Sequence, residues 1–283
     1  MTHPPGKASG VKGQYTCIAD SISAGEEISV GHHVVVESEV CIGAHTRIGD
    51  HAVIARNVQI GEGCEIGRHV VIHEGVQIGN GVRIDDGAVI GKQPMAAANS
   101  AVTRKHKQPP CRIGSGCLIG TGAVLYAGCV LEEHVLIADL ATIREEVTVG
   151  SHTIIGRGVA VENECAIGQY CKIETNAYIA AYSVVEDRAF VAPGVLTSND
   201  NFLGRTKDRF RHFKGAVIRR GARLGTGSVI LPGMEIEGDA VVAAGALLTK
   251  NAAARTIHAG VPARTHRTVP EEQLLENQGW EDV

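Results

Sequence analysis

The chain has 283 residues, of which 44% are hydrophobic but only 4% aromatic, with 35 glycines and a formal net charge of −4. Nearly all of the apolar content is aliphatic, which excludes a disordered chain and favours many narrow layers of β structure. The charge argues against a general nucleic-acid binder, and the lack of a long apolar run or an apolar start argues against a membrane span or signal peptide. We therefore expect a cytoplasmic protein with no nucleic-acid or membrane partner.

A six-residue period dominates the sequence. Aliphatic residues occupy every sixth position eleven times from Val30 to Ile90, fourteen times from Ile113 to Val191 and six times from Ile218 to Leu248. The residue two positions earlier is usually small or β-branched, and a glycine often follows the aliphatic residue. Because strand side chains alternate between faces, both positions point inward, and glycine permits a tight corner. The period thus predicts a short strand and a corner, repeated many times.

This pattern resembles that of the hexapeptide-repeat proteins, which place three hexapeptides on each triangular coil. The resemblance implies an all-β fold, a single-stranded left-handed parallel β-helix of about ten coils over residues 18–251. The handedness is implied by the resemblance and not by the spacing. Residues 1–17 are expected to be an N-terminal lead-in, and residues 252–283 a C-terminal cap and tail in which residues 270–277 form a short amphipathic helix.

Two insertions interrupt the repeat, near residues 92–110 and near residues 192–216. Insertions in a solenoid lie outside the stack and often form its working surface. The first carries the basic stretch 104–107 and the second the basic stretch 209–214. These charges suit either a solvated surface or contact with the diphosphate of a nucleotide-linked sugar or of coenzyme A.

Cysteines and histidines recur in register with the coil. Six of the eight cysteines occupy the small inward position, where a thiol packs as a small hydrophobe, and we expect no metal cofactor. One coil has eighteen residues, so His33, His51 and His69 should stack in one corner column, and His134 with His152 in another. Stacked imidazoles can bind a metal, and the γ-class carbonic anhydrases share this fold and use histidines with zinc. A favourable corner residue that merely recurs on the surface is the alternative.

Glu145 and Asn163 are also eighteen residues apart and should share a corner. Lys92, where the first insertion begins, heads the same column if the insertion leaves the coil count unchanged. The spacing thus predicts a carboxylate and an amide side by side beneath an overhanging loop. A purely structural corner pair is the alternative.

Three segments, 139–145, 161–163 and 197–200, are similar to segments of the bacterial N-acyltransferases that modify nucleotide-linked amino sugars, such as dTDP-3-amino-3,6-dideoxyhexoses. The resemblance implies transfer of an acyl group from acyl-coenzyme A, with acetyl-CoA as the default co-substrate, to a sugar amine. It also implies a homotrimer with active sites at the subunit boundaries. The resemblance and the spacing together give catalytic candidates and substrate-binding candidates: Glu145, Asn163 and His134 for the first, and Lys92, Arg144, Asn199 and Asp200 for the second.

The segments 243–250 and 260–263 look like the coenzyme A segment of the same family, although Val261 stands where related proteins usually have Asn. The residues expected to contact coenzyme A are Arg219, Arg220, Ala244, Gly245 and Lys250.

Direct attack of the amine on the thioester is the expected mechanism, in which positioning supplies much of the rate. Glu145 would accept a hydrogen bond from the amine, or its proton, and Asn163 would fix the amine or a neighbouring hydroxyl. A backbone N–H near Gly156 or Gly158 would stabilise the oxyanion. The departing thiolate can itself collect the proton.

Other functions remain open on the sequence alone. Acetylation of a hydroxyl would need a stronger base, and His134 or His152 would then be essential. Metal-dependent hydration like that of the γ-class carbonic anhydrases is a second alternative. A β-helical scaffold or binding module is the third, and the two insertions and the coenzyme-like segment argue against it. Both dTDP and UDP fit the sequence as the nucleotide.

Overall fold

The computed structural model describes residues 11–98, 100 and 106–280, so Arg104 and Lys105 of the first basic stretch lie outside the described residues. The chain divides into two compact units. The first comprises residues 11–96 and 106–146, and the second comprises residues 147–280 together with residues 97, 98 and 100. Each unit is described by itself.

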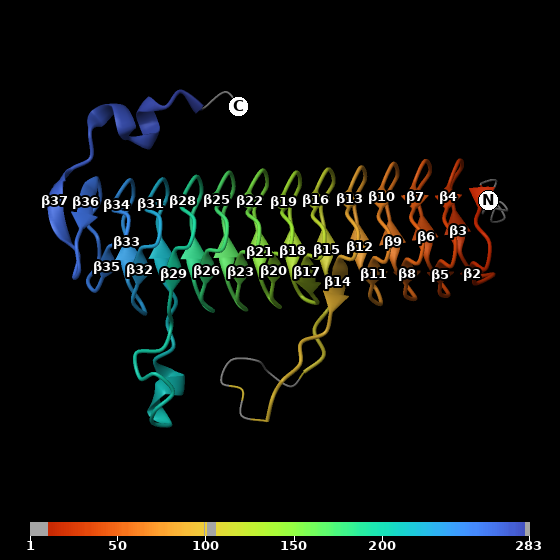
Figure 1. Ribbon diagram of the computed structural model, residues 1–283, viewed down its shortest axis with the longest axis horizontal. Coiled ribbons are helices and arrows are strands. Elements are labelled where there is room, and N and C mark those ends of the chain that lie inside the picture. The colour runs from red at the N-terminus through yellow and green to blue at the C-terminus, as the bar shows by residue number, and fades with distance from the viewer. Residues whose placement is uncertain (1–10, 99, 101–105, 281–283) are drawn as a thin grey trace, which may run out of the picture. The chain divides into compact units, whose positions relative to one another are not determined.

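The first unit consists of short parallel strands in three sheets (Figure 1). Its first sheet has the order β1 (Val11–Lys12), β4 (Ser29–Val30), β7 (Arg47–Ile48), β10 (Glu65–Ile66), β13 (Arg83–Ile84), β16 (Leu118–Ile119) and β19 (Leu136–Ile137). Its second sheet has the order β2 (Cys17–Ile18), β5 (Val35–Val36), β8 (Val53–Ile54), β11 (Val71–Ile72), β14 (Val89–Lys92), β17 (Val124–Tyr126) and β20 (Thr142–Ile143). Its third sheet has the order β3 (Ser23–Ala24), β6 (Cys41–Ile42), β9 (Gln59–Ile60), β12 (Gln77–Ile78), β15 (Arg112–Ile113) and β18 (Val130–Leu131).

The second unit repeats this arrangement and ends in an antiparallel strand. One sheet has the order β22 (Ile154–Ile155), β25 (Lys172–Ile173), β28 (Phe190–Val191), β31 (Arg223–Leu224), β34 (Val241–Val242), β36 (Thr256–Ala259) and β37 (Arg264–Thr268). Another has the order β23 (Ala160–Val161), β26 (Tyr178–Ile179), β29 (Leu196–Thr197), β32 (Val229–Ile230) and β35 (Leu247–Leu248). The remaining sheet has the order β21 (Thr148–Val149), β24 (Ala166–Ile167), β27 (Val184–Val185), β30 (Val217–Ile218) and β33 (Glu235–Ile236).

Within each unit, consecutive hexapeptide strands belong to different sheets, and each pairs in parallel with the strand three places further along the chain. The end of the second unit differs, because β36 pairs with β34 and β37 pairs antiparallel with β36. In β8, β11 and β14, for example, Ile54 pairs with Ile72 and Ile72 with Ile90. This is the parallel β-helix of the left-handed type that the sequence predicts, and the all-β fold class is confirmed. It has about 13 turns rather than ten. The expected number is too low because it comes from counting aliphatic residues, whereas strands such as β3 and β29 have Ala24 and Thr197 at the inward position.

Two residues of each hexapeptide fill the interior. In the coil around β11, Val70 and Ile72 are both fully buried, whereas Val71 between them faces outward. Stacking one isoleucine on the next removes both from water, and each contributes about 1.5–3 kcal/mol. The glycine that often follows the aliphatic residue serves a different purpose from the one expected. A Cβ at Gly43 would lie 2.4 Å from the backbone carbon of Gly61 in the next coil, so close stacking and not a positive φ requires the glycine.

The cysteines behave as the repeat predicts. The six at the inward position are buried and the other two, Cys17 and Cys41, are exposed, all of them free. Burial raises the pKa of three of the buried thiols: to about 11 for Cys117, about 12 for Cys165 and about 11 for Cys171. A thiol with so high a pKa stays protonated at neutral pH and serves packing.

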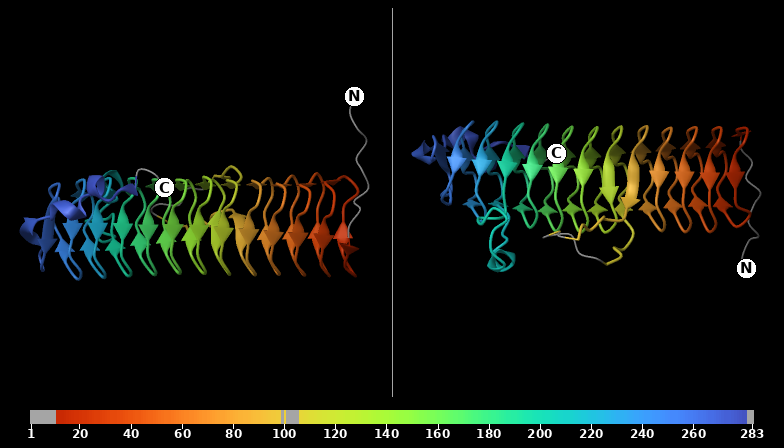
Figure 2. Two further views of the ribbon diagram at one scale, coloured as in Figure 1. Left: turned by 90° about the horizontal axis from the view of Figure 1, so that it is seen from above. Right: turned by 60° about the horizontal axis from the view of Figure 1, so that its bottom comes forward.

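The insertions and the tail differ in detail from the sequence expectation. The second insertion begins only after β29 and contains the 3-10 turn η1 (Asp208–Arg211); it projects from the coils of the second unit (Figure 2). The tail forms β36 and β37 and then two 3-10 turns, η2 (Glu271–Gln273) and η3 (Leu275–Asn277), in place of one helix. Leu274, between the two turns, has an extended backbone, and its side chain is almost fully buried among the hydrophobic residues of the core. Among the described residues, no helix is long and apolar enough to cross a bilayer.

The inward ladder supplies the first testable prediction. Ile72→Ala is expected to lower the free energy of unfolding by about 2–5 kcal/mol, because it leaves a cavity between two coils that cannot collapse onto each other. The matched control is Gln77→Ala, which alters an exposed side chain of β12 and is expected to change it by less than about 0.5 kcal/mol. Urea unfolding followed by circular dichroism measures both. Equal effects of the two substitutions would contradict the assignment of the core.

Candidate functional site

A break in the regular ladder of the first unit brings polar side chains together. The pairing of β14 with β17 shifts register between Ile90 and Lys92, so Lys92 pairs with Tyr126. The bulged residue, Gly91, has φ +81°, and a Cβ there would meet the Val76 side chain at 2.4 Å. Only glycine fits this position. The bulge therefore places Lys92 opposite Tyr126. The next residue, Ala127, lies eighteen residues before Glu145 and so belongs to the same corner column as Glu145.

The next coil adds a buried ion pair to this corner. The Arg144 guanidinium donates two hydrogen bonds to Glu145, from Nε to Oε2 at 2.8 Å and from Nη2 to Oε1 at 2.9 Å. Only 18% of the Arg144 side chain and 4% of the Glu145 side chain are exposed. The Tyr126 ring lies beneath both cations, 4.9 Å from Arg144 Cζ and 5.3 Å from Lys92 Nζ. A bidentate pair of this kind fixes the position of both carboxylate oxygens.

The described end of the first insertion is tied to the residue next to Glu145. Gln93 and Gln108 exchange two hydrogen bonds, side chain to backbone, each 2.9 Å long. Gln108 is 4% exposed, and its Nε2 donates to Glu146 Oε1 at 2.7 Å. His106 Nε2 lies 3.5 Å from the same carboxylate. The insertion thus overhangs this corner of the first unit.

A hollow of about 380 Å³ opens at the base of this insertion, and sequence reasoning missed it. His73 lines it, and burial together with the charge of Lys92 lowers the pKa of this imidazole, which is therefore neutral at pH 7. Glu74 at the rim is bridged by Arg56 at 3.4 Å and Lys107 at 3.6 Å. His73 belongs to no eighteen-residue series, so only the interruption of the hexapeptide period after Ile90 could have pointed to it.

Asn163 lies in the second unit and is 1% exposed. Its backbone carbonyl accepts a hydrogen bond from the Tyr182 N–H at 3.2 Å, but its side-chain Oδ1 has no partner. A buried amide oxygen without a donor is costly and is suited to receive an N–H or O–H from a ligand. Glu145 and Asn163 belong to different units, so their juxtaposition stays a prediction from the eighteen-residue spacing.

The predicted oxyanion donor at Gly156 is already engaged. Its N–H donates to the Ile173 carbonyl at 2.7 Å, as the ladder of the second unit requires.

The second insertion uses Asp200 to hold its own shape. The Asp200 carboxylate accepts hydrogen bonds from the N–H groups of Phe202 at 2.8 Å and Gly204 at 2.9 Å, and from Arg209 at 2.9 Å. Burial raises the pKa of Asp200, but these donors outweigh it and the pKa is lowered. Asp200 is thus occupied within the insertion, and Asn199 is the neighbour whose side chain is left for a ligand.

Of the residues expected to contact coenzyme A, Arg219 is neutralised by two carboxylates. It donates to Glu186 and to Glu235, at 2.6 Å in each case, and these bonds raise its pKa. Arg220 and Lys250 are exposed. Ala244 and Gly245 are exposed at the next corner, where Gly245 has φ +67°.

The histidine columns lie at exposed corners. His33, His51 and His69 stack in parallel with ring centroids 4.9 and 4.8 Å apart, and Tyr15 continues the column at 5.3 Å. All three histidines have positive φ, as the corner requires.

His134 and His152 lie at exposed corners of the first and the second unit, and His152 stacks on Tyr170 at 4.9 Å. Within the described residues no group of three or more His, Cys, Asp or Glu side chains is arranged to hold a metal ion.

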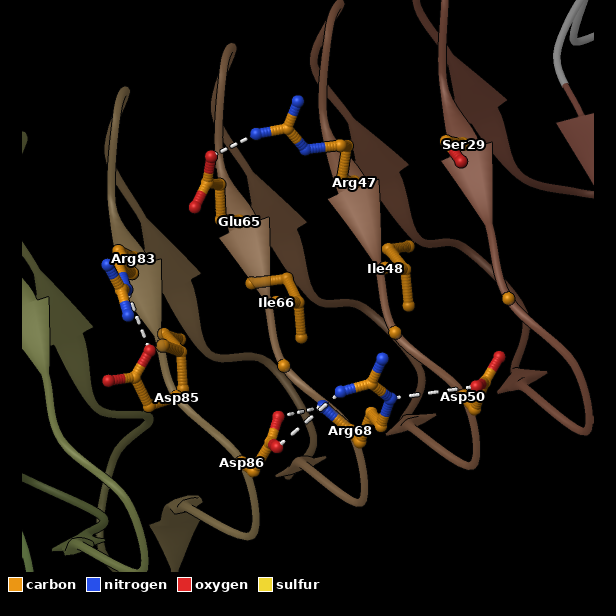
Figure 3. Close-up of a pocket in the computed structure, with 14 residues that line it drawn as sticks. Ser29, Arg47, Ile48, Asp50, Glu65, Ile66, Arg68, Arg83, Asp85 and Asp86 are labelled. Carbon is orange, nitrogen blue, oxygen red and sulfur yellow. Dashed lines mark hydrogen bonds and ion pairs between the residues drawn. The ribbon is translucent and has the colours of Figure 1, made fainter.

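A charged hollow also lies on the first sheet of the first unit (Figure 3). Its charges pair with one another: Arg83 with Asp85 at 2.7 Å, and Arg68 with Asp50 at 3.7 Å and Asp86 at 3.9 Å. Arg47 also pairs with Glu65, so every charged side chain that lines the hollow has a partner, and its three arginines and four carboxylates leave one net negative charge.

Family models match two segments of the chain. Residues 57–92 match the bacterial transferase hexapeptide family (six repeats), and residues 215–250 match the hexapeptide repeat of succinyl-transferase. These two segments therefore carry hexapeptide repeats of the kind found in transferases. No curated protein matches it significantly.

Several solved structures share the fold in part. A point mutant of AntD, an N-acyltransferase from Bacillus cereus in complex with dTDP and coenzyme A, is 17% identical over 50% of this chain and 84% of its own, with a TM-score of 0.44. The UDP-N-acetylglucosamine acyltransferase of Francisella novicida is 19% identical over 88% and 73%, with a TM-score of 0.48. A hexapeptide-repeat acetyltransferase of Vibrio cholerae, complexed with acetyl coenzyme A, is 21% identical over 44% and 71%, with a TM-score of 0.39. Likeness at this level does not bear on the substrate of the chain.

The role of Asp200 can be tested by hydrogen exchange. Asp200→Asn is expected to speed exchange of the Phe202 and Gly204 amides severalfold, because a neutral amide is a weaker acceptor than a carboxylate. In the wild type, a lowered pKa means that this protection is complete above the ordinary value of 3.8 and is lost as the pH falls through the lowered pKa. The control is Asp208→Asn, since Asp208 pairs only with exposed side chains. Exchange that is unchanged in Asp200→Asn, or equally fast in both variants, would contradict the assignment.

Proposed function

We propose that this protein transfers an acyl group, acetyl by default, from acyl-coenzyme A to the amine of a nucleotide-linked amino sugar in the cytoplasm. The matches of residues 57–92 and 215–250 to hexapeptide-repeat models of transferases support the reaction class. The similarity of residues 139–145, 161–163 and 197–200 to amino-sugar N-acyltransferases supports the acceptor. The observation that carries the proposal is the buried, arginine-clamped carboxylate of Glu145 at the corner that the first insertion overhangs.

In the reaction, the amine lone pair attacks the thioester carbonyl carbon, a C–N bond forms and the C–S bond breaks. The nitrogen loses one proton and the departing thiolate gains one, so the products are the amide and the free thiol of coenzyme A. Because Arg144 holds both oxygens of Glu145 in place, we assign Glu145 the task of accepting an amine N–H and orienting the lone pair. The proton then passes to the sulfur. Asn163, with its unpartnered Oδ1, would accept a second N–H or a neighbouring sugar hydroxyl.

The charges suggest which basic residues bind the diphosphate of the sugar nucleotide and which bind the diphosphate of coenzyme A. Lys92 is not held in an ion pair within the described residues and is assigned to the sugar nucleotide, with Asn199 as a further contact. Arg219 is neutralised by its two carboxylates, so Arg220 and Lys250 are assigned to coenzyme A, beside Ala244 and Gly245. Arg219 instead positions the segment that carries Arg220, whose N–H also bonds to Glu186. A homotrimer would form clefts between its subunits that can hold a long coenzyme A molecule, because the surface of a single β-helix offers little concave space.

The proposal predicts that Glu145→Gln and Asn163→Ala each lower kcat about a hundredfold, because each removes a group that fixes the attacking nitrogen. The assay is release of the coenzyme A thiol from acetyl-CoA in the presence of dTDP- and UDP-linked amino sugars. Glu62→Gln is the control: Glu62 occupies the same place in its hexapeptide, two residues after the inward isoleucine, but is exposed. Near-normal turnover in both site variants, or no release with any amino sugar, would overturn the proposal.

Acylation of a hydroxyl is a second candidate, favoured by one observation. His73 presents a neutral imidazole to the hollow beneath the first insertion, and deprotonation of a hydroxyl needs such a base.

If this is the reaction, His73→Gln abolishes thiol release with a hydroxyl acceptor while leaving release with an amine acceptor intact. The lowered pKa keeps His73 unprotonated below its ordinary value of 6.5, so wild-type kcat/KM stays on its plateau to a pH below 6.5 and falls only at more acid pH. A pH profile with each acceptor measures this. A plateau that ends above pH 6.5, or full activity of His73→Gln with the hydroxyl acceptor, would exclude the role.

A further inference from the structure

The C-terminal tail closes a second pocket in the second unit. It has a volume of about 270 Å³ and lies between β25, β28 and β31 on one side and the turns η2 and η3 on the other. The second insertion leaves the coils from the end of β29, in a different sheet, and Figure 1 shows it on the opposite side of these coils from the tail. None of the residues assigned above to acyl transfer lines this pocket.

Three cations converge on the pocket: Lys172, Arg188 and Arg223. Within the described residues none of them is held in an ion pair. Arg188 is stacked on the Tyr170 ring at 4.6 Å and donates only to a backbone carbonyl, that of Trp280, at 3.0 Å. One carboxylate, Asp239, also lines the pocket. The net charge of the side chains that line the pocket is therefore positive, and no ion pair among the described residues neutralises the three cations.

Arg223 is left incompletely satisfied. Its Nη2 is buried without a hydrogen-bond partner, and its Nη1 reaches the side-chain oxygen of Gln273 only at 3.4 Å, at the outer limit for a hydrogen bond. Arg223 is half-exposed, but its buried Nη2 is an idle donor, and an oxyanion can satisfy it because an oxyanion accepts two parallel hydrogen bonds from a guanidinium. The neutral amide oxygen of Gln273 occupies the place where such a group would bind.

The remaining wall is aromatic. Tyr170, Phe190 and Trp280 line the pocket beside the cations. The Tyr170 ring is already stacked against His152 and Arg188, so Phe190 and Trp280 are the rings against which a planar group can pack. The Asp239 Oδ1 accepts the Leu275 N–H at 3.0 Å and so fastens the tail, while the Asp239 charge offsets one of the three cations. The pocket therefore places positively charged side chains next to an apolar surface of aromatic rings.

We propose that this tail pocket binds a small ligand that contains both an anionic oxygen group, phosphate or carboxylate, and a planar ring, and that the anion displaces Gln273 from Arg223. Lys172 supplies a second positive charge, and Trp280 packs against the ring. This site is independent of the acyl transfer proposed above. It makes the tail a ligand-responsive part of the second unit.

The test uses Trp280, the one tryptophan of the chain, as a reporter built into the pocket. Its fluorescence is followed in the full-length protein during titration with AMP, with 4-hydroxybenzoate and with inorganic phosphate. We expect a saturable change with AMP or with 4-hydroxybenzoate, and the tighter of the two identifies the phosphate or the carboxylate as the natural anion. Inorganic phosphate, which has no ring, should bind at least about tenfold more weakly.

Variants separate the pocket from general charge effects. Arg223→Gln should weaken binding at least about tenfold, since it removes a charge-assisted hydrogen bond. Arg267→Gln, on exposed β37 outside the pocket, carries the same charge change and should leave binding unaltered. Gln273→Ala removes the competing amide and should bind as tightly as the wild type or more tightly.

Three outcomes would overturn the proposal: no saturable change with either ring-bearing probe, equal loss in the Arg223 and Arg267 variants, or weaker binding in Gln273→Ala. Lys172→Gln, which alters an exposed side chain, keeps the test decisive if Arg223→Gln fails to fold, and it should weaken binding severalfold. Unchanged binding in Lys172→Gln would then count against the site.

Discussion

Stacking of inward aliphatic side chains from one coil to the next is the constraint on which both units depend. Ile54, Ile72 and Ile90 pair in register along one sheet, and most of the other short strands repeat the same arrangement within each unit. Because each strand is so short, the interior has room for only two side chains per hexapeptide, and the charged side chains lie outward or at a corner, while small hydroxyl side chains such as Thr46 and Thr153 fit inside. The eighteen-residue length of a coil therefore determines which corner residues are neighbours within a unit, whatever their chemical type.

Chemistry gathers where this regularity fails. On a regular face each charged side chain pairs with a neighbour, as in the hollow on the first sheet of the first unit. The bulge at Gly91 and the insertion that follows it bring Lys92 over Tyr126 and bury Gln108 against Glu146. The tail produces the second departure, by covering one face of the second unit. Both hollows that carry proposals here are bounded by segments outside the repeat.

The distribution of partners separates residues that shape a site from residues left to act. Asp200 and Arg219 carry charges that the fold already uses, one to close the second insertion and the other to bridge two carboxylates. Glu145 is clamped by Arg144 and yet belongs to the corner that the first insertion overhangs, so it suits holding a nitrogen better than removing a proton. Asn163 and Arg223 retain buried polar atoms without partners, and such atoms are satisfied most simply by a ligand.

The sequence by itself determined the all-β coil, the inward cysteines and the corner positions of the histidines, because a period of six fixes which side chains face inward regardless of what surrounds them. It also placed Glu145 and Arg144 at a corner following an insertion. Only the tertiary structure decided that Gly91 bulges, that Asp200 and Arg219 are consumed internally, that His73 lines a hollow, and that residues 270–277 form two turns around a buried Leu274. These features depend on contacts between segments that no repeat period relates, and local spacing carries no information about them.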